Sequence, residues 1–327
     1  MATMKDVAKQ AGTSVATVSR FINKSGYVSK EAQKNVQKAI DDLNYTPNEV
    51  ARSLYQKKSK FIGILLPDIT NPFVTMLSKG IEDHLSESDY GLILANVGND
   101  PDKEAKYLTT FRNNNVAGII SAIEHKTAFD EDILHVSIDR PSPTEKHSVL
   151  SDDYKGGQLT AREIAKRTTK DVFILNSTEH LEKSHLRMNG MRSVFDETGH
   201  VYHVHDVPTY RPEEAEGIIS HILKVYPNVD SVIAANDIQA MVLIKEASEQ
   251  QLIIPDDLQI MGYDDITYSK LTTPGISTIA QPIYEMGIIG AELLLRMIHG
   301  ERISKNKIVL PVEFIERGTL RKLENLK

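Results

Sequence analysis

Short apolar runs alternate with helix-like segments from Phe61 almost to the end of the chain. The runs include FIGILLP, YGLILANV, AGIISAI, LHVSID, DVFILNS, DSVIAAND and LQIMGYDD. β-rich runs of this size between amphipathic helices are typical of parallel sheets with helices on both faces. We therefore predict an α/β body over residues 61–327, and the sequence has no internal repeat that would favour a solenoid.

The first 46 residues have a different pattern, that of three short helices. Val7 and Ala11 lie on one face of a first helix, which Gly12 can end by taking a positive φ. Ser14 and Ser29 are good N-caps for a second and a third helix. Two short helices across a tight turn, completed by a third, make a helix-turn-helix, so we predict an all-α head over residues 1–46.

Charge divides the chain in the same place. Residues 1–60 carry eleven Lys or Arg and five acids, a net charge of +6. The whole chain carries −7, which leaves −13 for residues 61–327. A basic head on an acidic body is typical of a polyanion-binding module attached to a separate domain, although a solvated charged surface is the simpler alternative.

The second predicted helix is of a size that fits the major groove of DNA. Arg20 can offer two parallel hydrogen bonds to a guanine, and Val15 or Ala16 can touch a thymine methyl group. Neutral side chains nearby can donate hydrogen bonds to phosphates, namely Ser14, Thr17, Ser19, Asn23 and Tyr27. Together with the first N-cap, Thr3, these residues form the predicted DNA-binding surface of the head, and a generic three-helix bundle is the alternative.

Polar side chains stand at the ends of the apolar runs in the body. They are Asn71, Asp139, Arg140, Asn236, Asp264 and Gln281. Ligands of parallel α/β folds bind at the carboxyl ends of the strands. Carboxylates, amides and guanidinium groups can each meet two sugar hydroxyls, while an aromatic ring packs on the apolar face of a sugar. The set therefore predicts a sugar pocket.

Several classes of protein are disfavoured by what the sequence lacks. There is no Cys, hence no disulfide framework and no thiolate metal site, and no apolar run reaches the roughly 18 residues of a membrane span. The N-terminus lacks the apolar core of a signal peptide, so we expect a cytoplasmic protein without a membrane partner.

Enzyme and metal signals are also missing from the sequence. Neither a phosphate-binding P-loop nor a Gly-x-Ser-x-Gly elbow occurs. The histidines considered as metal ligands are His125, His135, His180, His185, His200, His203 and His205. They form no zinc motif with a partner acid, and the stretch HVYHVHD is typical of a surface strand. We therefore expect no catalytic residues, no metal and no cofactor.

The stretches MKDVAKQAGTSVATVSRFIN, GYVS and LNYTPNEVARSL together resemble the lactose-repressor (LacI) family of bacterial transcription regulators. The resemblance implies that residues 47–60 are a hinge helix and linker. Leu54 would then be an apolar wedge in the minor groove, with Ala51 and Arg52 against the groove and backbone. Two-fold readers of DNA match pseudo-palindromic operators, so a homodimer on such an operator is expected.

The body is similar to periplasmic sugar-binding proteins, whose two lobes close on a ligand. Matching TNPF, IDR, LRMNG, AAND, GYDD and TIAQP implies effector contacts from Asn71, Phe73, Asp139, Arg140, Arg187, Asn236, Asp264 and Gln281, with Tyr210 as a second ring. The resemblance also implies a first lobe, nearest the DNA, of residues 61–158 plus 289–320. Residues 159–288 would form the second lobe.

This set of motifs is most like that of ribose-binding proteins and ribose-operon repressors. We therefore expect a sequence-specific repressor of a sugar-utilisation operon, with ribose as its small-molecule effector. A sucrose- or fructoside-responsive or sugar-phosphate-responsive regulator is the alternative. A free sugar receptor is more remote, because it would need export and would leave the basic head unexplained. An enzyme on the same fold is more remote because the sequence shows no catalytic motif.

Overall fold

A computed structural model describes residues 2–23, 25–45, 59–98, 100–125, 132–142, 145–167, 169–176, 182–207, 209, 211–304 and 306–323. The chain divides into two compact units, the head and linker at Met1–Lys60 and the body at Phe61–Lys327. Tyr210 and the predicted hinge residues Ala51, Arg52 and Leu54 lie outside the described residues.

The head is the predicted bundle of three helices. They are α1 (Met4–Gln10), α2 (Val15–Ile22) and α3 (Lys30–Leu43). Each begins at a residue whose side chain accepts a hydrogen bond from a backbone N–H of the first turn, Thr3, Ser14 and Ser29 respectively. Val7 and Val18 are fully buried in the small core between the helices. The all-α head predicted from the spacing is therefore confirmed.

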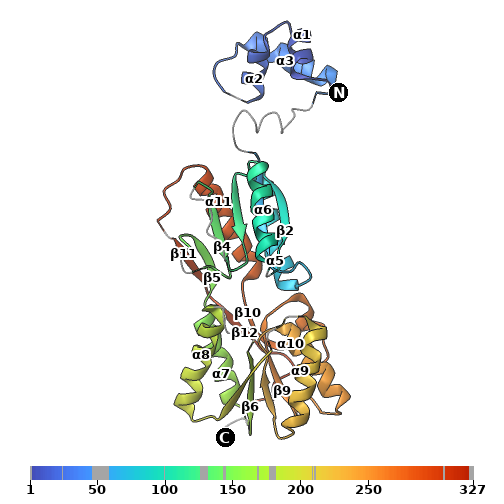
Figure 1. Cartoon of the computed structure of the whole chain (residues 1–327), viewed down its shortest axis with the longest axis vertical. Helices are drawn as coiled ribbons and strands as arrows, with labels where there is room; N and C mark the ends of the chain where they lie inside the picture. Colours follow the sequence, from blue (N-terminus) through green and yellow to red (C-terminus); the bar gives the residue numbers. More distant parts are fainter. Residues whose placement is uncertain are drawn as a thin grey trace. The chain divides into compact units, whose positions relative to one another are not determined.

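The described residues of the body form two six-stranded sheets, one in each lobe (Figure 1). In the first lobe the strand order is β11-β5-β4-β3-β1-β2, and all neighbouring strands are parallel. Its strands are β1 (Phe61–Leu66), β2 (Gly91–Asn96), β3 (Gly118–Ser121), β4 (His135–Ile138), β5 (Ser148–Ser151) and β11 (Lys307–Leu310), and its helices are α5 (Pro72–Glu87), α6 (Pro101–Asn113) and α11 (Ile283–Ile298).

The second lobe has the strand order β12-β10-β9-β8-β6-β7, parallel except that β12 runs antiparallel to β10. Its strands are β6 (Val172–Asn176), β7 (Tyr202–Asp206), β8 (Ser231–Ile233), β9 (Gln259–Asp264), β10 (Ser277–Ala280) and β12 (Glu313–Ile315). Its helices are α7 (Asp153–Ala165), α8 (Glu182–Thr198), α9 (Pro212–Val225) and α10 (Asp237–Glu249), with a 3₁₀ turn at Thr267–Lys270.

Helices cover both faces of each sheet. In the first lobe Ile64 of β1 packs among residues of α5 and α11, whereas its neighbour Leu65 packs on the other face against Phe111 of α6. In the second lobe Phe173 of β6 lies in the core under α9 and α10, and Ile174 lies in the core under α7 and α8. Adjacent residues of one strand thus enter opposite cores, which is why the strands read as continuous apolar runs. The predicted α/β body is confirmed.

The chain crosses between the lobes three times. The crossings lie between β5 and α7 at Asp152, between β10 and α11 at 281–282, and between β11 and β12 at 311–312. In Figure 1 α11 lies beside the first-lobe strands although it follows β10 of the second lobe in the chain.

These crossings correct the lobe limits expected from the sequence. Residues 153–158 begin α7, which packs against α8 and so belongs to the second lobe. Residues 283–288 begin α11, which packs on β3, β4 and β5 of the first lobe. Residues 313–320 return to the second lobe, because β12 pairs with β10 and Leu320 enters its core.

Helices α7 and α8 approach each other closely at two glycines. A Cβ on Gly157 would lie 2.0 Å from the carbonyl oxygen of Arg187, and one on Gly190 would lie 2.1 Å from that of Tyr154. Real Cβ atoms essentially never come so close to a backbone oxygen. The two glycines therefore fix the distance between the helix that carries Arg187 and its neighbour.

We expect Gly157→Ala to lower the free energy of unfolding by about 1–3 kcal/mol, because the added methyl group forces the two helices apart. Gly217→Ala is the matched control, since Gly217 is exposed on α9 and nothing lies within 4 Å of its added Cβ. That change should raise the free energy of unfolding by about 0.5–1 kcal/mol, the helix-propensity gain. Denaturant unfolding of both variants measures the two effects, and equal stabilities would contradict the packing argument.

Candidate functional site

The surface of α2 presents the residues predicted to contact bases. Ala16 and Arg20 are exposed, and Val15 is 41 % exposed. Tyr27, which follows the helix, is 87 % exposed. None of these side chains is needed for the core of the head, which the opposite face of α2 supplies through Val18. The exposed face is therefore free to meet a ligand.

Polar side chains at the rim of this surface are held by local hydrogen bonds. The Thr3 hydroxyl donates to Asp6 Oδ2 at 2.7 Å, completing a capping box. The Ser14 hydroxyl accepts from the backbone N–H of Thr17 at 3.1 Å. Asn23 Nδ2 donates to Ser19 Oγ at 3.2 Å. Thr3 thus starts α1 as its N-cap.

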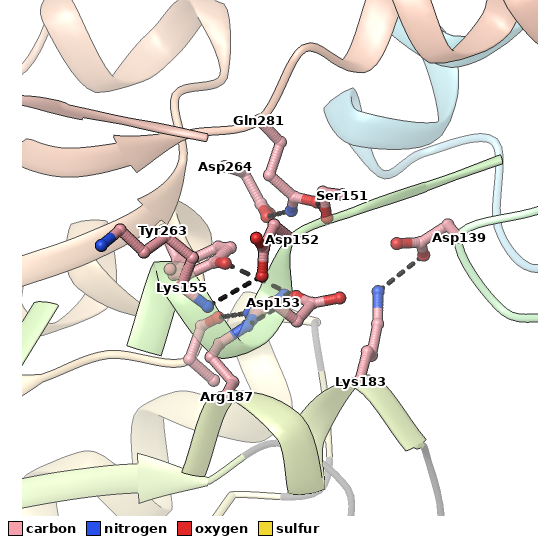
Figure 2. A network of polar contacts seen from close by, with 12 residues as sticks. Asp139, Ser151, Asp152, Asp153, Lys155, Lys183, Arg187, Tyr263, Asp264 and Gln281 are labelled. Atoms are coloured by element: carbon pink, nitrogen blue, oxygen red, sulfur yellow. Dashed lines mark hydrogen bonds and ion pairs between the residues drawn. The ribbon is translucent and has the colours of Figure 1, made fainter. Parts of the chain in front are cut away.

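In the body, Asp139 lies where β4 ends and lines a cavity to which both lobes contribute residues. Figure 2 shows its contact with Lys183. Its Oδ2 accepts a hydrogen bond from Lys183 Nζ at 2.6 Å and a long one from Arg140 Nε at 3.4 Å. Burial alone would raise the pKa of Asp139, but the positive charges of Lys183 and Arg140 outweigh it and hold the pKa below its usual value. Asp139 therefore stays ionised in a buried position.

Arg187, on α8, is the centre of a second group of contacts. Its Nη2 and Nε donate to Asp153 Oδ1 at 2.8 and 3.1 Å, and its Nη1 donates to the carbonyl of Ala235 at 3.0 Å. The guanidinium also stacks on Tyr263, 3.4 Å from the ring centroid. Burial raises the pKa of Asp153 even though Arg187 lies beside it.

Asp264, at the end of β9, joins the two lobes through a third group of contacts. Its Oδ1 accepts from Gln281 Nε2 at 2.6 Å, and Gln281 Oε1 accepts from the Ser151 hydroxyl at 2.5 Å. Ser151 ends β5 of the first lobe, so the chain of hydrogen bonds runs across the lobe boundary (Figure 2). Burial raises the pKa of Asp264 to about 6, although Arg187 and Lys183 oppose the rise.

The remaining predicted effector residues are also held by the fold. Asn71 and Asn236 are the N-caps of α5 and α10, and their side-chain oxygens accept from Phe73 N and Gln239 N. Each cap uses only the amide oxygen. The Phe73 ring lies 5.5 Å from the Lys183 ammonium, which places it next to Asp139.

The structure thus brings most of the predicted set to one place. Asp139 and Arg140 line the cavity itself, which measures about 390 Å³ counting the part open to solvent. The groups are also connected electrostatically, because the positive charge of Arg187 favours the ionised forms of both Asp139 and Asp264. Carboxylates, a guanidinium, an amide and a ring that converge in this way can hydrogen-bond several hydroxyls and stack on one apolar face.

Sequence reasoning missed four residues of this cluster, Ser151, Asp153, Lys183 and Tyr263. Tyr263 lies within GYDD, the motif that indicated Asp264, so its neighbour gave a signal. Lys183 lies four residues before Arg187, one helical turn earlier, and the same face of α8 could have indicated it.

Several of the described histidines form separate contacts with acidic side chains. No three metal-binding side chains among the described residues are placed to hold an ion. His125 pairs with Glu104 at 2.7 Å, His135 pairs with Glu145 at 2.5 Å, and His203 on β7 lies 3.1 Å from Asp171. In the described part of the chain, no helix is long and apolar enough to cross a bilayer.

The head and the body define the class of the protein, a DNA-binding regulator with a body like a periplasmic binding protein. Residues 3–48 match the model of bacterial regulatory proteins of the lacI family, and residues 162–320 match that of the periplasmic binding protein-like domain. The chain is 42 % identical to the ribose operon repressor of Bacillus subtilis (strain 168), over 98 % of this chain and 99 % of that protein. The chain belongs to the lacI family.

Solved structures agree with this fold. The periplasmic binding ribose operon repressor protein from Lactobacillus acidophilus superposes with a TM-score of 0.74 at 27 % identity, over 81 % of this chain and all of that one. The lac repressor dimer bound to operator and the anti-inducer ONPF superposes with a TM-score of 0.87 at 21 % identity, over 98 % of this chain and 99 % of that one. The family consists of regulators, so the expectation that the chain is not an enzyme is confirmed by its family.

We expect Asp264→Asn to remove a pH dependence of stability. The folded state binds a proton at Asp264 more tightly than the unfolded chain, because the pKa is about 6 instead of 3.8. This carboxyl therefore stabilises the fold at low pH, and that contribution is lost as the pH rises through the folded pKa. The unfolding free energy of the variant minus that of the parent should increase from about pH 4 to about pH 7 and then level off. Denaturant unfolding at a series of pH values measures it, and a difference that is flat or falls would contradict the raised pKa.

Proposed function

We propose that the chain represses a sugar-utilisation operon and that its effector is a small neutral sugar, ribose before others. It acts in the cytoplasm as a homodimer on a pseudo-palindromic operator. The observation that carries the proposal is a connected polar network at a cavity that Asp139, Ser151 and Asp153 line. Arg187 pairs with Asp153, and Gln281 joins Asp264 to Ser151. The same chain presents Arg20 on an exposed helix. A relative named ribose operon repressor at 42 % identity supports the choice of ribose.

The cavity suits a compact sugar. Phe73 is the ring for stacking, and Val74, which stands where ribose binders often have a second aromatic residue, is only 2 % exposed. Lys183 is already paired with Asp139, and Arg187 is paired with Asp153. A neutral ligand therefore adds hydrogen bonds without bringing an uncompensated charge into a buried site. Sucrose, fructosides and sugar phosphates are the competitors that experiment must separate.

The proposed response to the sugar is release from DNA. The effector bridges groups of both lobes and so favours their closed arrangement, as expected for a two-lobed binding fold. Residues 47–60 connect the body to the head, and the family resemblance assigns them to a hinge helix. A short helix of this kind is marginal alone and forms only with support, so a change at its body end can shift its population. The coupling between the sugar and the operator would be about 1–3 kcal/mol.

The experiment is a titration of labelled operator-like DNA followed by fluorescence anisotropy, with ribose, sucrose, fructose and their phosphates added in turn. We expect ribose to weaken operator binding by about 5-fold to 150-fold, the range of typical allosteric coupling. Tighter operator binding with ribose would reverse the sign of the proposed response. If none of these sugars changes operator binding, the sugar-responsive function is overturned.

Arg20→Ala serves as the control in the same assay. It should weaken operator binding by about 1–3 kcal/mol and relax the base preference, because it removes a pair of hydrogen bonds to a base. It should leave ribose affinity unchanged, since Arg20 lies in the other compact unit. Arg296→Ala removes a surface cation of the body that pairs with Glu301 and should leave both affinities as they are.

A further inference from the structure

Lys183 connects the two lobes across the cavity. It belongs to the first turn of α8 in the second lobe, and its partner Asp139 follows β4 of the first lobe. The two side chains are 13 % and 3 % exposed, so the 2.6 Å contact between them is shielded from water. Neither the family motifs nor the relatives' names assign this lysine a role.

The pair has unused hydrogen-bonding capacity on both sides. Asp139 Oδ1 is buried and has no hydrogen-bond partner among the described residues. An ammonium group has three N–H donors, and within the described part of the chain Lys183 donates to Asp139 Oδ2. A buried acceptor beside available donors is costly unless a ligand or water completes the set. One hydroxyl could donate to Oδ1 and accept from the ammonium at the same time.

The position of Phe73 indicates where such a hydroxyl would come from. The Lys183 ammonium lies 5.5 Å from the centre of the Phe73 ring. A sugar that stacks on this ring would carry its hydroxyls at its edge, within reach of Lys183 and Asp139. Lys183 also lines the cavity together with Asp139 and Arg140.

The charge of the lining determines the chemical class of the ligand. The charged residues of the cavity are Glu124, Asp139, Asp153, Glu182, Arg140 and Lys183, four acids against two bases. The positive charge of Lys183 is already opposed by Asp139. A phosphate would add negative charge to a lining that is net negative, whereas a neutral polyol would only add hydrogen bonds.

We propose that Lys183 is a further effector-binding residue that, with Asp139, reads one hydroxyl of a neutral sugar and joins the lobes around it. The inference rests on the proposed function and names the part of the site that selects ribose over its phosphate. Because the two residues belong to different lobes, each hydrogen bond that the sugar adds to the pair also favours the closed arrangement.

The test measures ribose binding to the full chain by calorimetry, with Lys183→Met set against Arg211→Met. Arg211 is the matched control, because it also pairs with a residue of the other lobe, Asp68, at 3.8 Å, but is 65 % exposed and does not line the cavity. Lys183→Met should weaken ribose binding by about 10-fold to 100-fold, as for the loss of a hydrogen bond to a charged group. Arg211→Met should change it by less than about 2-fold, as for an exposed ion pair.

Deoxy sugars distinguish a direct contact from a general effect on folding. We expect one of 2-deoxyribose, 3-deoxyribose and 5-deoxyribose to bind the parent at least about 10-fold more weakly than ribose. The same deoxy sugar and ribose should bind Lys183→Met with equal affinity, because the missing hydroxyl and the missing ammonium belong to one interaction. Lys183→Gln, which keeps a donor and removes the charge, should fall between parent and Lys183→Met. Operator binding by each variant shows that it is folded.

Each outcome bears on one idea. The role of Lys183 would be overturned if Lys183→Met bound ribose as tightly as the parent. It would also be overturned if, for every deoxy sugar, the affinity lost through the substitution simply added to the affinity lost through the missing hydroxyl. Either result would leave the proposed function standing. Ribose 5-phosphate should bind the parent at least about 100-fold more weakly than ribose. Binding of ribose 5-phosphate that is as tight as that of ribose, or tighter, would overturn the charge argument. A parent chain that binds none of these sugars would overturn the proposed function, and this inference with it.

Discussion

The contact between Arg187 and Asp153 holds the second lobe's side of the cavity in place. Two nitrogens of the guanidinium donate to one carboxylate oxygen, a third donates to Ala235, and the plane stacks on Tyr263. Both charges are largely removed from water, so losing either partner would leave an unpaired buried charge, which typically costs about 3–5 kcal/mol. The close approach of α7 and α8 at Gly157 and Gly190 brings the two residues together. The packing of two helices thus sets the electrostatics of the site.

Much of the fold could be predicted from local pattern. The N-caps Thr3, Ser14 and Ser29 and the spacing of Val7 and Ala11 predicted the head, because capping and helical period are properties of neighbouring residues. The alternation of short apolar runs with helix-like segments predicted sheets with helices on both faces. The lobe limits were wrong by several residues, because periodicity shows that α11 and β12 exist but not which sheet they join. Those choices depend on contacts far apart in the sequence.

In the candidate effector site, too, local sequence pattern indicated some residues and missed others. Residues at strand ends, such as Asp139 and Asp264, could be found because a parallel sheet collects them at one edge. Lys183 and Asp153 lie on helices and reach the site only through the crossing of α7 over α8 and the approach of the lobes. The positive charges of Lys183 and Arg140 keep the pKa of Asp139 low, whereas burial raises that of Asp264 to about 6. A sequence motif names the groups, but only the fold shows their ionisation.

This difference in ionisation makes the central claim measurable through protons. Sugar hydroxyls that donate to Asp264 favour its ionised form, so ribose binding should release part of a proton near the pKa of about 6 and almost none two pH units higher. Calorimetric titration of the full chain with ribose, in two buffers of different ionisation enthalpy at each pH, measures this number directly. Release near pH 6 that disappears in the Asp264→Asn variant is the result we predict. Saturable ribose binding with no proton release at either pH would place the sugar elsewhere and contradict the account.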